Sequence, residues 1–219
     1  MRWRSGCGRR LGRSRKALSS LRDFVGWAKR SVPTILKPHP AAVRCIMPQY
    51  VRAKGSIFFF TVVLAQRPSN LLVEEIDRLR RIYQAVQLRH SFETVAICIL
   101  PDHIHALWAL PDGDADFSTR WSLIKSGFSR GLDARARSPS KVAKREKGIW
   151  QRRYWEHAIR DDEDFERHVD YIHFNPVKHG HVTRVTDWPH SSFHRFVERG
   201  LLAEDWGGDL RNIQGSFGE

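Results

Sequence analysis

FETVAICILPDHIHALWAL (residues 92–110) contains two runs of apolar and β-branched residues on either side of Pro101-Asp102. Runs of this length and composition are typical of buried strands. A Pro-Asp pair favours a tight turn. We therefore predict two antiparallel strands, residues 92–100 and 103–110, joined by that turn.

The flanking sequence adds two strands and three helices to this pair. The aromatic and β-branched run at 57–64 predicts a central strand, and 149–159 predicts a fourth. Helical spacing of apolar residues predicts helices at 71–88, 118–130 and 162–175, the last ended by Pro176. The order β-α-β-β-α-β predicts an α+β, ferredoxin-like antiparallel sheet. Its helices lie on one face, with a further helix and a C-terminal tail.

The chain divides into three parts by composition. We predict a basic arm at 1–46, one domain at 47–206 and a polar tail at 207–219. The arm holds 12 Lys or Arg and one acid, so it carries +11 of the net charge of +13. Disorder or an upstream start-site artefact explains such an arm, and a DNA-binding arm or a transit peptide are the alternatives.

The predicted domain is close to neutral, so any DNA groove must be a local basic patch. No apolar run approaches the roughly 20 residues that span a bilayer. Three widely spaced cysteines form neither a disulfide framework nor a zinc pattern, and they fit a reduced, cytoplasmic setting.

His103 and His105 project from the same side of the predicted strand, because side chains alternate along it. Two neutral imidazoles so placed can hold one divalent ion. Two surface or core histidines are the alternative interpretation.

Tyr171 and Asn175 lie one turn apart on the third predicted helix, on a polar stripe with Asp164 and His168. That stripe can present a phenolic nucleophile and a further metal ligand. A metal beside a tyrosine suits attack on a DNA phosphate with a covalent phosphotyrosine product. A half-buried tyrosine with hydrogen-bonded neighbours is the alternative.

Four motifs together resemble a known family. They are LPDHIH (100–105), WQRRYWEHAIR (150–160), YIHFNPVKHG (171–180) and DWPHSSFH (187–194). Their order resembles the single-tyrosine HUH transposases of the IS200/IS605 superfamily, and most of all the REP-associated tyrosine transposases. The resemblance covers residues 47–206 and leaves 1–46 unmatched.

The resemblance implies a metal-dependent endonuclease and strand transferase that acts on single-stranded DNA. It makes His103 and His105 metal ligands and Tyr171 the nucleophile that forms a 5′-phosphotyrosine. Asn175 occupies the place of the third ligand, where other members of the superfamily use the longer glutamine. The expected ion is Mg²⁺ or Mn²⁺. His168 could serve as the base, or it could be structural.

The substrate implied by the resemblance is a single-stranded, REP-like palindromic hairpin. The best candidates for DNA contacts combine cations with aromatic rings: Arg152, Arg153, Tyr154 and Trp155. Weaker candidates are Trp121, Lys125 and Arg130. Tyr154 and Trp155 could instead be core residues of the fourth strand. The basic loop 131–148 fits a phosphate-contacting flap or a solvated run of charge.

Two other functions stay open on sequence alone. One is a catalytically silent hairpin-binding protein derived from such a transposase. The other is an unrelated hydrolase that uses the two histidines and a water nucleophile. The chain could act as a monomer or as a homodimer.

Overall fold

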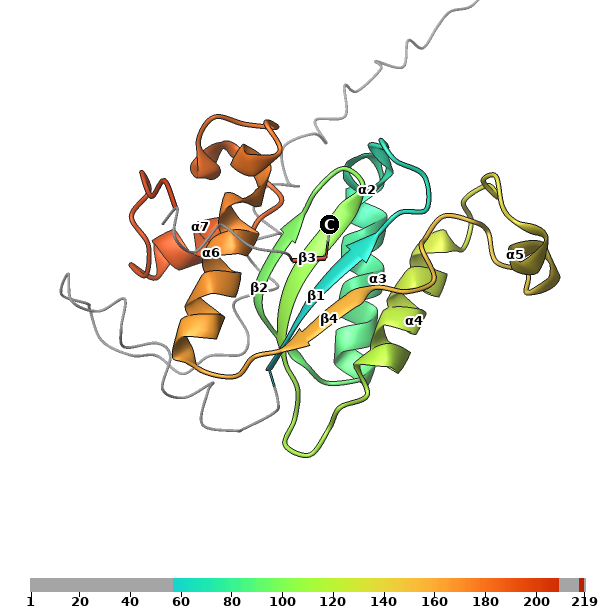
Figure 1. The fold of residues 1–219 in the computed structure, drawn as a ribbon, viewed down its shortest axis with the longest axis horizontal. Coiled ribbons are helices and arrows are strands. Elements are labelled where there is room, and N and C mark those ends of the chain that lie inside the picture. The colour runs from blue at the N-terminus through green and yellow to red at the C-terminus, as the bar shows by residue number, and fades with distance from the viewer. Residues whose placement is uncertain (1–56, 209–216, 219) are drawn as a thin grey trace, which may run out of the picture. The chain divides into compact units, whose positions relative to one another are not determined.

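A four-stranded antiparallel sheet forms the centre of the computed structural model, which describes residues 57–208 and 217–218 (Figure 1). The strand order is β2-β3-β1-β4, with bounds Glu93–Ile99, His103–Ala109, Ile57–Val63 and Trp155–Ala158. The predicted α+β architecture is confirmed. The predicted arm, residues 1–46, and most of the predicted tail lie outside the described residues.

The two central strands set the positions of the candidate site residues. In the register of β1 against β3, Thr61 pairs with His105 and Val63 with His103. On its other edge β1 pairs with β4, where Thr61 faces Trp155. The first histidine of the pair therefore begins β3, directly after the predicted turn, and the second lies beside Thr61.

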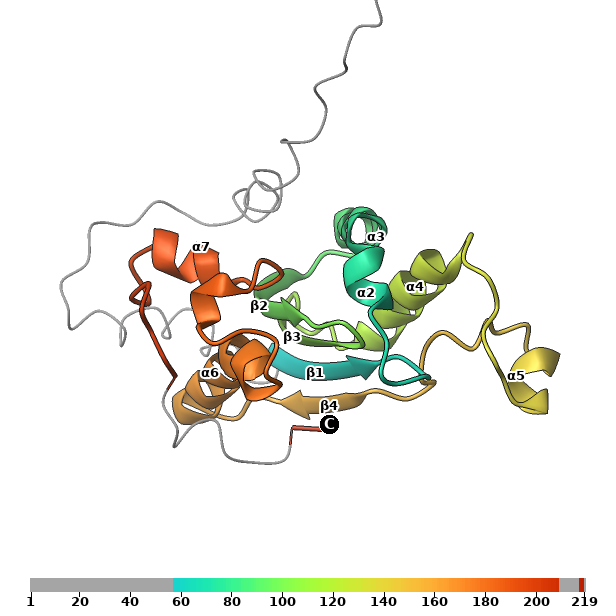
Figure 2. The same cartoon turned by 90° about the horizontal axis from the view of Figure 1, so that it is seen from above.

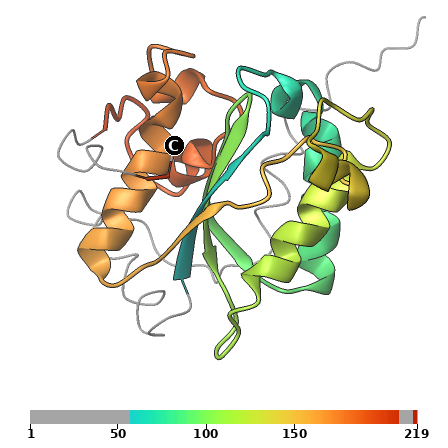
Figure 3. The ribbon, with the colours of Figure 1, turned by 45° about the vertical axis from the view of Figure 1, so that its right-hand side comes forward.

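Helices cover both faces of the sheet (Figures 2 and 3). On one face lie α3 (Ile76–Arg89) and α4 (Phe117–Ser129), and on the other lies α6 (Asp162–Lys178). Successive side chains of β1 separate accordingly. Phe60 packs on Trp121 of α4, with ring centroids 5.6 Å apart, and Phe59 packs on Tyr171 of α6, with centroids 6.1 Å apart.

Two predicted elements have different bounds in the structure. The predicted helix 71–88 is divided at Glu75 into α2 (Leu71–Glu74) and α3. The predicted strand 149–159 is wrong in length, because β4 covers four residues and Trp150 forms only an isolated bridge with Leu64. Before β4, Lys125 Nζ donates to the carbonyls of Gln151 and Arg152, which a strand would use for pairing.

The predicted basic loop 131–148 contains one short helix, α5 (Pro139–Ala143). Cations of this loop also hydrogen-bond its own backbone. Arg137 donates to the carbonyl of Glu146, and Lys147 donates to that of Leu132. The segment therefore has internal structure that its charge pattern did not predict.

The end of α6 also differs from the prediction, because Pro176 lies inside the helix. The helix instead ends in a Schellman motif, in which the amide of Gly180 bonds the carbonyl of Val177 and the amide of His181 bonds that of Pro176. Gly180 has φ +70°, the left-handed conformation that this motif requires. The helix therefore runs one turn further than predicted and includes Lys178.

The segment after α6 packs against the edge strand β2. It contains a 3-10 helix, η4 (Val185–Asp187), and the short helix α7 (Phe193–Glu198). Ser192 accepts from the amide of Ile97 through its hydroxyl and donates its own amide to the carbonyl of the same residue. Within the described residues, none of the helices has the length and apolar character needed to cross a membrane.

Candidate active site

His103 and His105 lie side by side in the sheet, both buried, as the strand alternation predicted. Their ring centroids are 4.8 Å apart and their planes meet at 81°. Two imidazoles about 2.1 Å from a shared ion have ring centres roughly 4.6–5.3 Å apart for ligand angles of about 90–109°. The pair therefore has the spacing of a metal-binding pair.

Hydrogen bonds fix which nitrogen of His103 is available. Its Nδ1 lies 2.6 Å from Asp102 Oδ1. Burial would raise the pKa of Asp102, but hydrogen bonds from Arg67 and His103 outweigh it and lower that pKa. An ionised carboxylate only accepts, so Nδ1 carries a hydrogen, and in the neutral ring Nε2 carries the lone pair. Carboxylate–histidine pairs of this kind orient metal ligands in proteins.

The tautomer of His105 follows from the single hydrogen of the Thr61 hydroxyl. That hydroxyl donates to the backbone carbonyl of Phe217 at 2.6 Å and also lies 2.9 Å from His105 Nδ1. Because its hydrogen goes to the carbonyl, the hydroxyl oxygen accepts from Nδ1. His105 therefore also has its lone pair on Nε2, which is the form that binds a metal.

Tyr171 of α6 lies against this pair. It is fully buried, and its ring centroid is 5.1 Å from that of His105, in an edge-on arrangement. The ammonium group of Lys178 donates to Tyr171 Oη at 3.2 Å and lies 4.7 Å from the ring centroid. The structure thus brings the predicted nucleophile and the predicted metal pair together.

The same face of α6 carries Asn175 and His179. Asn175 is buried, and the His179 ring centroid lies 5.1 Å from that of His103. This separation is also within the range for two imidazoles on one ion. Sequence reasoning missed Lys178 and His179, because it ended the helix at Pro176. Their spacing of seven and eight residues from Tyr171 would have indicated them on a longer helix.

Phe217 covers the tyrosine. Its ring is stacked on that of Tyr171, with centroids 3.7 Å apart and an angle of 19° between the planes. Gly218 lies directly against the indole of Trp155. The stacked ring of Phe217 thus covers one face of the phenol ring.

Residues 58–175 match the family model of IS200-like transposases. A REP-associated tyrosine transposase of Escherichia coli is 46% identical over 160 residues, which are 73% of this chain and 90% of that protein. This chain belongs to the IS200-like transposase family. A Haemophilus influenzae relative assigned to the REP-associated group is 50% identical over 158 residues, 71% of this chain and 90% of its own.

A solved structure agrees with this assignment. It is a REP-associated tyrosine transposase bound to a REP hairpin, with 41% identity and a TM-score of 0.65, covering 85% of this chain and 98% of that chain. The resemblance to REP-associated tyrosine transposases is therefore confirmed. The chain is an enzyme of the tyrosine transposase type.

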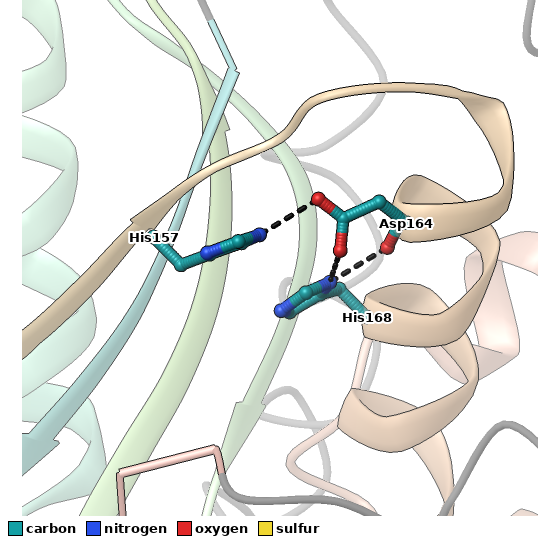
Figure 4. A group of neighbouring side chains, drawn as sticks. All are labelled: His157, Asp164 and His168. Atoms are coloured by element: carbon teal, nitrogen blue, oxygen red, sulfur yellow. Dashed lines mark hydrogen bonds and ion pairs between the residues drawn. The ribbon is translucent and has the colours of Figure 1, made fainter.

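A second polar cluster in this transposase joins β4 to the first turns of α6 (Figure 4). His157 Nε2 donates to Asp164 Oδ2 at 2.7 Å. His168 Nδ1 lies 2.6 Å from the backbone carbonyl of Asp164 and 3.3 Å from Oδ1. Potential ligand atoms of the three residues lie within 4.8 Å of one another, the spacing of a metal site.

The hydrogen bonds of this cluster fit a brace between β4 and α6 better than a metal centre. Asp164 also accepts from the amide and side chain of Arg160. Burial would raise the pKa of Asp164, but its hydrogen bonds lower it to about 2. The carboxylate is thus already paired with donors, and it fixes the helix that carries Tyr171.

His168, the predicted base, has its Nδ1 hydrogen directed at the carbonyl of Asp164. Burial lowers the pKa of His168 to about 4, so the ring is neutral near pH 7. Its Nε2 can accept a proton, although so low a pKa makes a weak base. The role of His168 as a base stays a prediction.

The predicted DNA contacts divide between the two faces of the sheet. Lys125 and Tyr154 lie together on the α4 face, with Nζ 5.7 Å from the ring centroid. Trp155 packs on Phe59, on the α6 face. Arg152 forms an exposed ion pair with Glu146, and Arg153 and Arg130 are exposed.

Trp121 does not belong to this group. It is fully buried and stacks on Trp108, with ring centroids 4.3 Å apart. Its place among the weaker DNA-binding candidates was wrong, because its apolar helix position makes it a core residue.

Proposed function

We propose that this transposase cleaves and rejoins single-stranded DNA at palindromic hairpins through a 5′-phosphotyrosine on Tyr171. The observation that carries the proposal is a buried tyrosine in contact with His105, whose ring packs on that of His103, with both histidines held in the metal-binding tautomer. A tyrosine that only supported the core would not need such neighbours.

His103, His105 and Asn175 would hold the Mg²⁺ or Mn²⁺ ion. The donor set can bind a divalent ion, because an amide oxygen is an ordinary ligand for Mg²⁺ or Mn²⁺ and the Nε2 lone pairs of neutral imidazoles bind divalent transition-metal ions. When bound, the ion would withdraw charge from an oxygen of the scissile phosphate.

The residues of the chain supply the nucleophile and its orientation. Tyr171 Oη loses its proton to solvent and forms a bond to phosphorus, while the bond from phosphorus to the 3′ oxygen breaks. That oxygen takes up a proton and becomes a free 3′-OH. Rejoining reverses these changes, so the cycle needs no external energy source. The brace through Asp164 holds α6 while the strand is exchanged.

The hairpin substrate is inferred from the solved relative that is bound to a REP hairpin. Lys125, Arg130, Arg152 and Arg153 offer cations for its phosphates, and Tyr154 and Trp155 offer partly exposed rings for its bases. Phosphate contacts of this kind make binding fall steeply with salt.

A covalent-adduct assay tests the proposal. The chain is incubated with labelled single-stranded hairpin DNA and Mn²⁺, and protein-linked label is resolved on a denaturing gel. We expect an adduct with the natural chain, none with Tyr171→Phe and none with EDTA. Cleavage that persists in Tyr171→Phe would indicate a water nucleophile instead.

A catalytically silent hairpin-binding protein is the second candidate. The stacking of Phe217 on Tyr171 favours it, because the nucleophile is covered. Hairpin binding without any adduct, in either Mg²⁺ or Mn²⁺ and also after Phe217→Ala, would support this candidate over the first.

A further inference from the structure

Lys178 contacts the atom on which the proposed reaction depends. Its Nζ donates to Tyr171 Oη at 3.2 Å. Both residues belong to α6, seven positions apart, and the helix continues through Pro176 to bring Lys178 to this position. Lys178 is exposed while Tyr171 is buried, so the ammonium group approaches the phenol from the solvent side.

We infer that Lys178 is a catalytic residue that stabilises negative charge on Tyr171 Oη during cleavage and rejoining. The inference rests on the proposed function. In cleavage the phenolic oxygen carries its largest negative charge before its bond to phosphorus is complete. In rejoining the same charge develops as that bond breaks. A fixed ammonium at hydrogen-bond distance favours both events.

The step balances with Lys178 protonated throughout. The phenolic proton leaves to solvent, the oxygen–phosphorus bond forms, and the bond from phosphorus to the 3′ oxygen breaks. The leaving oxygen takes a proton from solvent. Lys178 provides a positive charge and a hydrogen bond to Tyr171 Oη. It exchanges no proton, which distinguishes its role from that of a base.

Two of the other predicted DNA-contacting cations pair with groups other than the phenol in the described structure. Lys125 bonds the carbonyls of Gln151 and Arg152. Arg152 pairs with Glu146. The hydrogen bond to the phenol therefore assigns this role to Lys178.

Single-turnover adduct formation tests the inference with Lys178→Met, Lys178→Arg and a control, Arg89→Met. Arg89 is an exposed cation at the end of α3, on the other face of the sheet. Arg89→Met therefore removes one positive charge, as Lys178→Met does, but far from Tyr171. We expect Lys178→Met to slow adduct formation about ten- to hundredfold, as for loss of one charge-stabilising donor. Lys178→Arg should recover part of the rate, and Arg89→Met should lie within about twofold of the natural chain.

Three further measurements distinguish catalysis from a structural role. Hairpin affinity and melting temperature of Lys178→Met should match the natural chain. Rejoining should slow by the same factor as cleavage, because the two directions share a transition state. Alkylammonium ions added to Lys178→Ala should restore part of the rate, which they cannot do for a packing defect.

The outcomes separate this inference from the proposed function. If the natural chain forms an adduct and Lys178→Met forms it within about twofold of the same rate, Lys178 has no catalytic role and Tyr171 keeps its own. Slow reaction explained entirely by lost hairpin binding would also overturn the inference. If no variant, including the natural chain, forms an adduct, the proposed function fails and the role of Lys178 fails with it.

Discussion

At the scale of single residues, the proposed metal site depends on which ring nitrogen of each histidine carries a hydrogen. The sequence alone does not determine this. His103 and His105 are a common His-x-His pattern. Asp102 and Thr61 give them the same tautomer, with Nε2 available on each. Asp102 is adjacent in sequence and could have been considered in advance. Thr61 lies 44 residues away and becomes a neighbour only through the pairing of β1 with β3.

Replacing Thr61 with Val tests this tautomer argument. Val has the same shape but no hydroxyl, so the His105 imidazole loses the acceptor that fixes its hydrogen on Nδ1. We expect the affinity for Mn²⁺ to fall about tenfold, the lower end for loss of a residue that orients a ligand. Titration calorimetry of the DNA-free protein measures it, with Thr61→Ser as the matched control that keeps the hydroxyl. Equal affinity for all three proteins would refute the argument.

Phe217→Ala tests whether the stacked ring limits access to Tyr171. Aromatic stacking contributes about 0.5–1.5 kcal/mol beyond burial, so its removal should raise the rate of adduct formation about three- to tenfold. The rate is measured at saturating hairpin DNA, and Phe217→Tyr serves as a control that keeps the ring. A rate in Phe217→Ala that equals or falls below the natural one would show that Phe217 does not hinder the reaction.

At the scale of elements, apolar periodicity predicted the four strands and the helices well, because the formation of each element depends on local pattern. It failed where side chains compete for backbone groups. Lys125 takes the carbonyls of Gln151 and Arg152, which shortens β4. Gly180 ends α6 after Pro176 rather than before it. The second error hid Lys178 and His179, so the last two polar residues on this face of α6 were absent from the predicted site.

The packing of α3 on α4 gives a stability prediction. A Cβ added at Gly127 would lie 2.6 Å from Ile82 Cγ2. We expect Gly127→Ala to lower the free energy of unfolding by about 1–3 kcal/mol, the usual range for overpacking. Urea denaturation measures the change.

A double-mutant cycle provides the control for that prediction. Ile82→Ala removes the contacting methyl group, so Gly127→Ala should cost much less in that background. The same loss in both backgrounds would locate the effect of Gly127 elsewhere.

At the scale of the whole molecule, buried histidines connect stability to pH. Burial lowers the pKa of His168 to about 4 and that of His190 to about 4. Asp164, His157 and Arg167 are the charged or titratable groups around His168. In the unfolded chain these histidines bind protons near pH 6.5, while the folded chain keeps them neutral. The unfolded state therefore gains protons first, and stability falls as pH decreases from about 6.5 toward 4.5.

His168→Gln tests how much His168 contributes to the pH dependence of the unfolding free energy. The slope of unfolding free energy against pH should decrease by roughly 1 kcal/mol per pH unit in that window. Urea titrations at several pH values give the slope, with the exposed His179→Gln as the comparison. An unchanged slope in His168→Gln would mean that its folded and unfolded pKa values are alike.

The most direct measurement of the central claim uses two copies of one single-stranded hairpin, labelled at either the 3′ or the 5′ end. With Mn²⁺, the natural chain should acquire the 3′ label covalently and release the 5′-labelled fragment with a free 3′-OH. Tyr171→Phe should acquire neither label. Cleavage without label transfer, transfer of the 5′ label, or unchanged cleavage by Tyr171→Phe would contradict a 5′-phosphotyrosine on Tyr171.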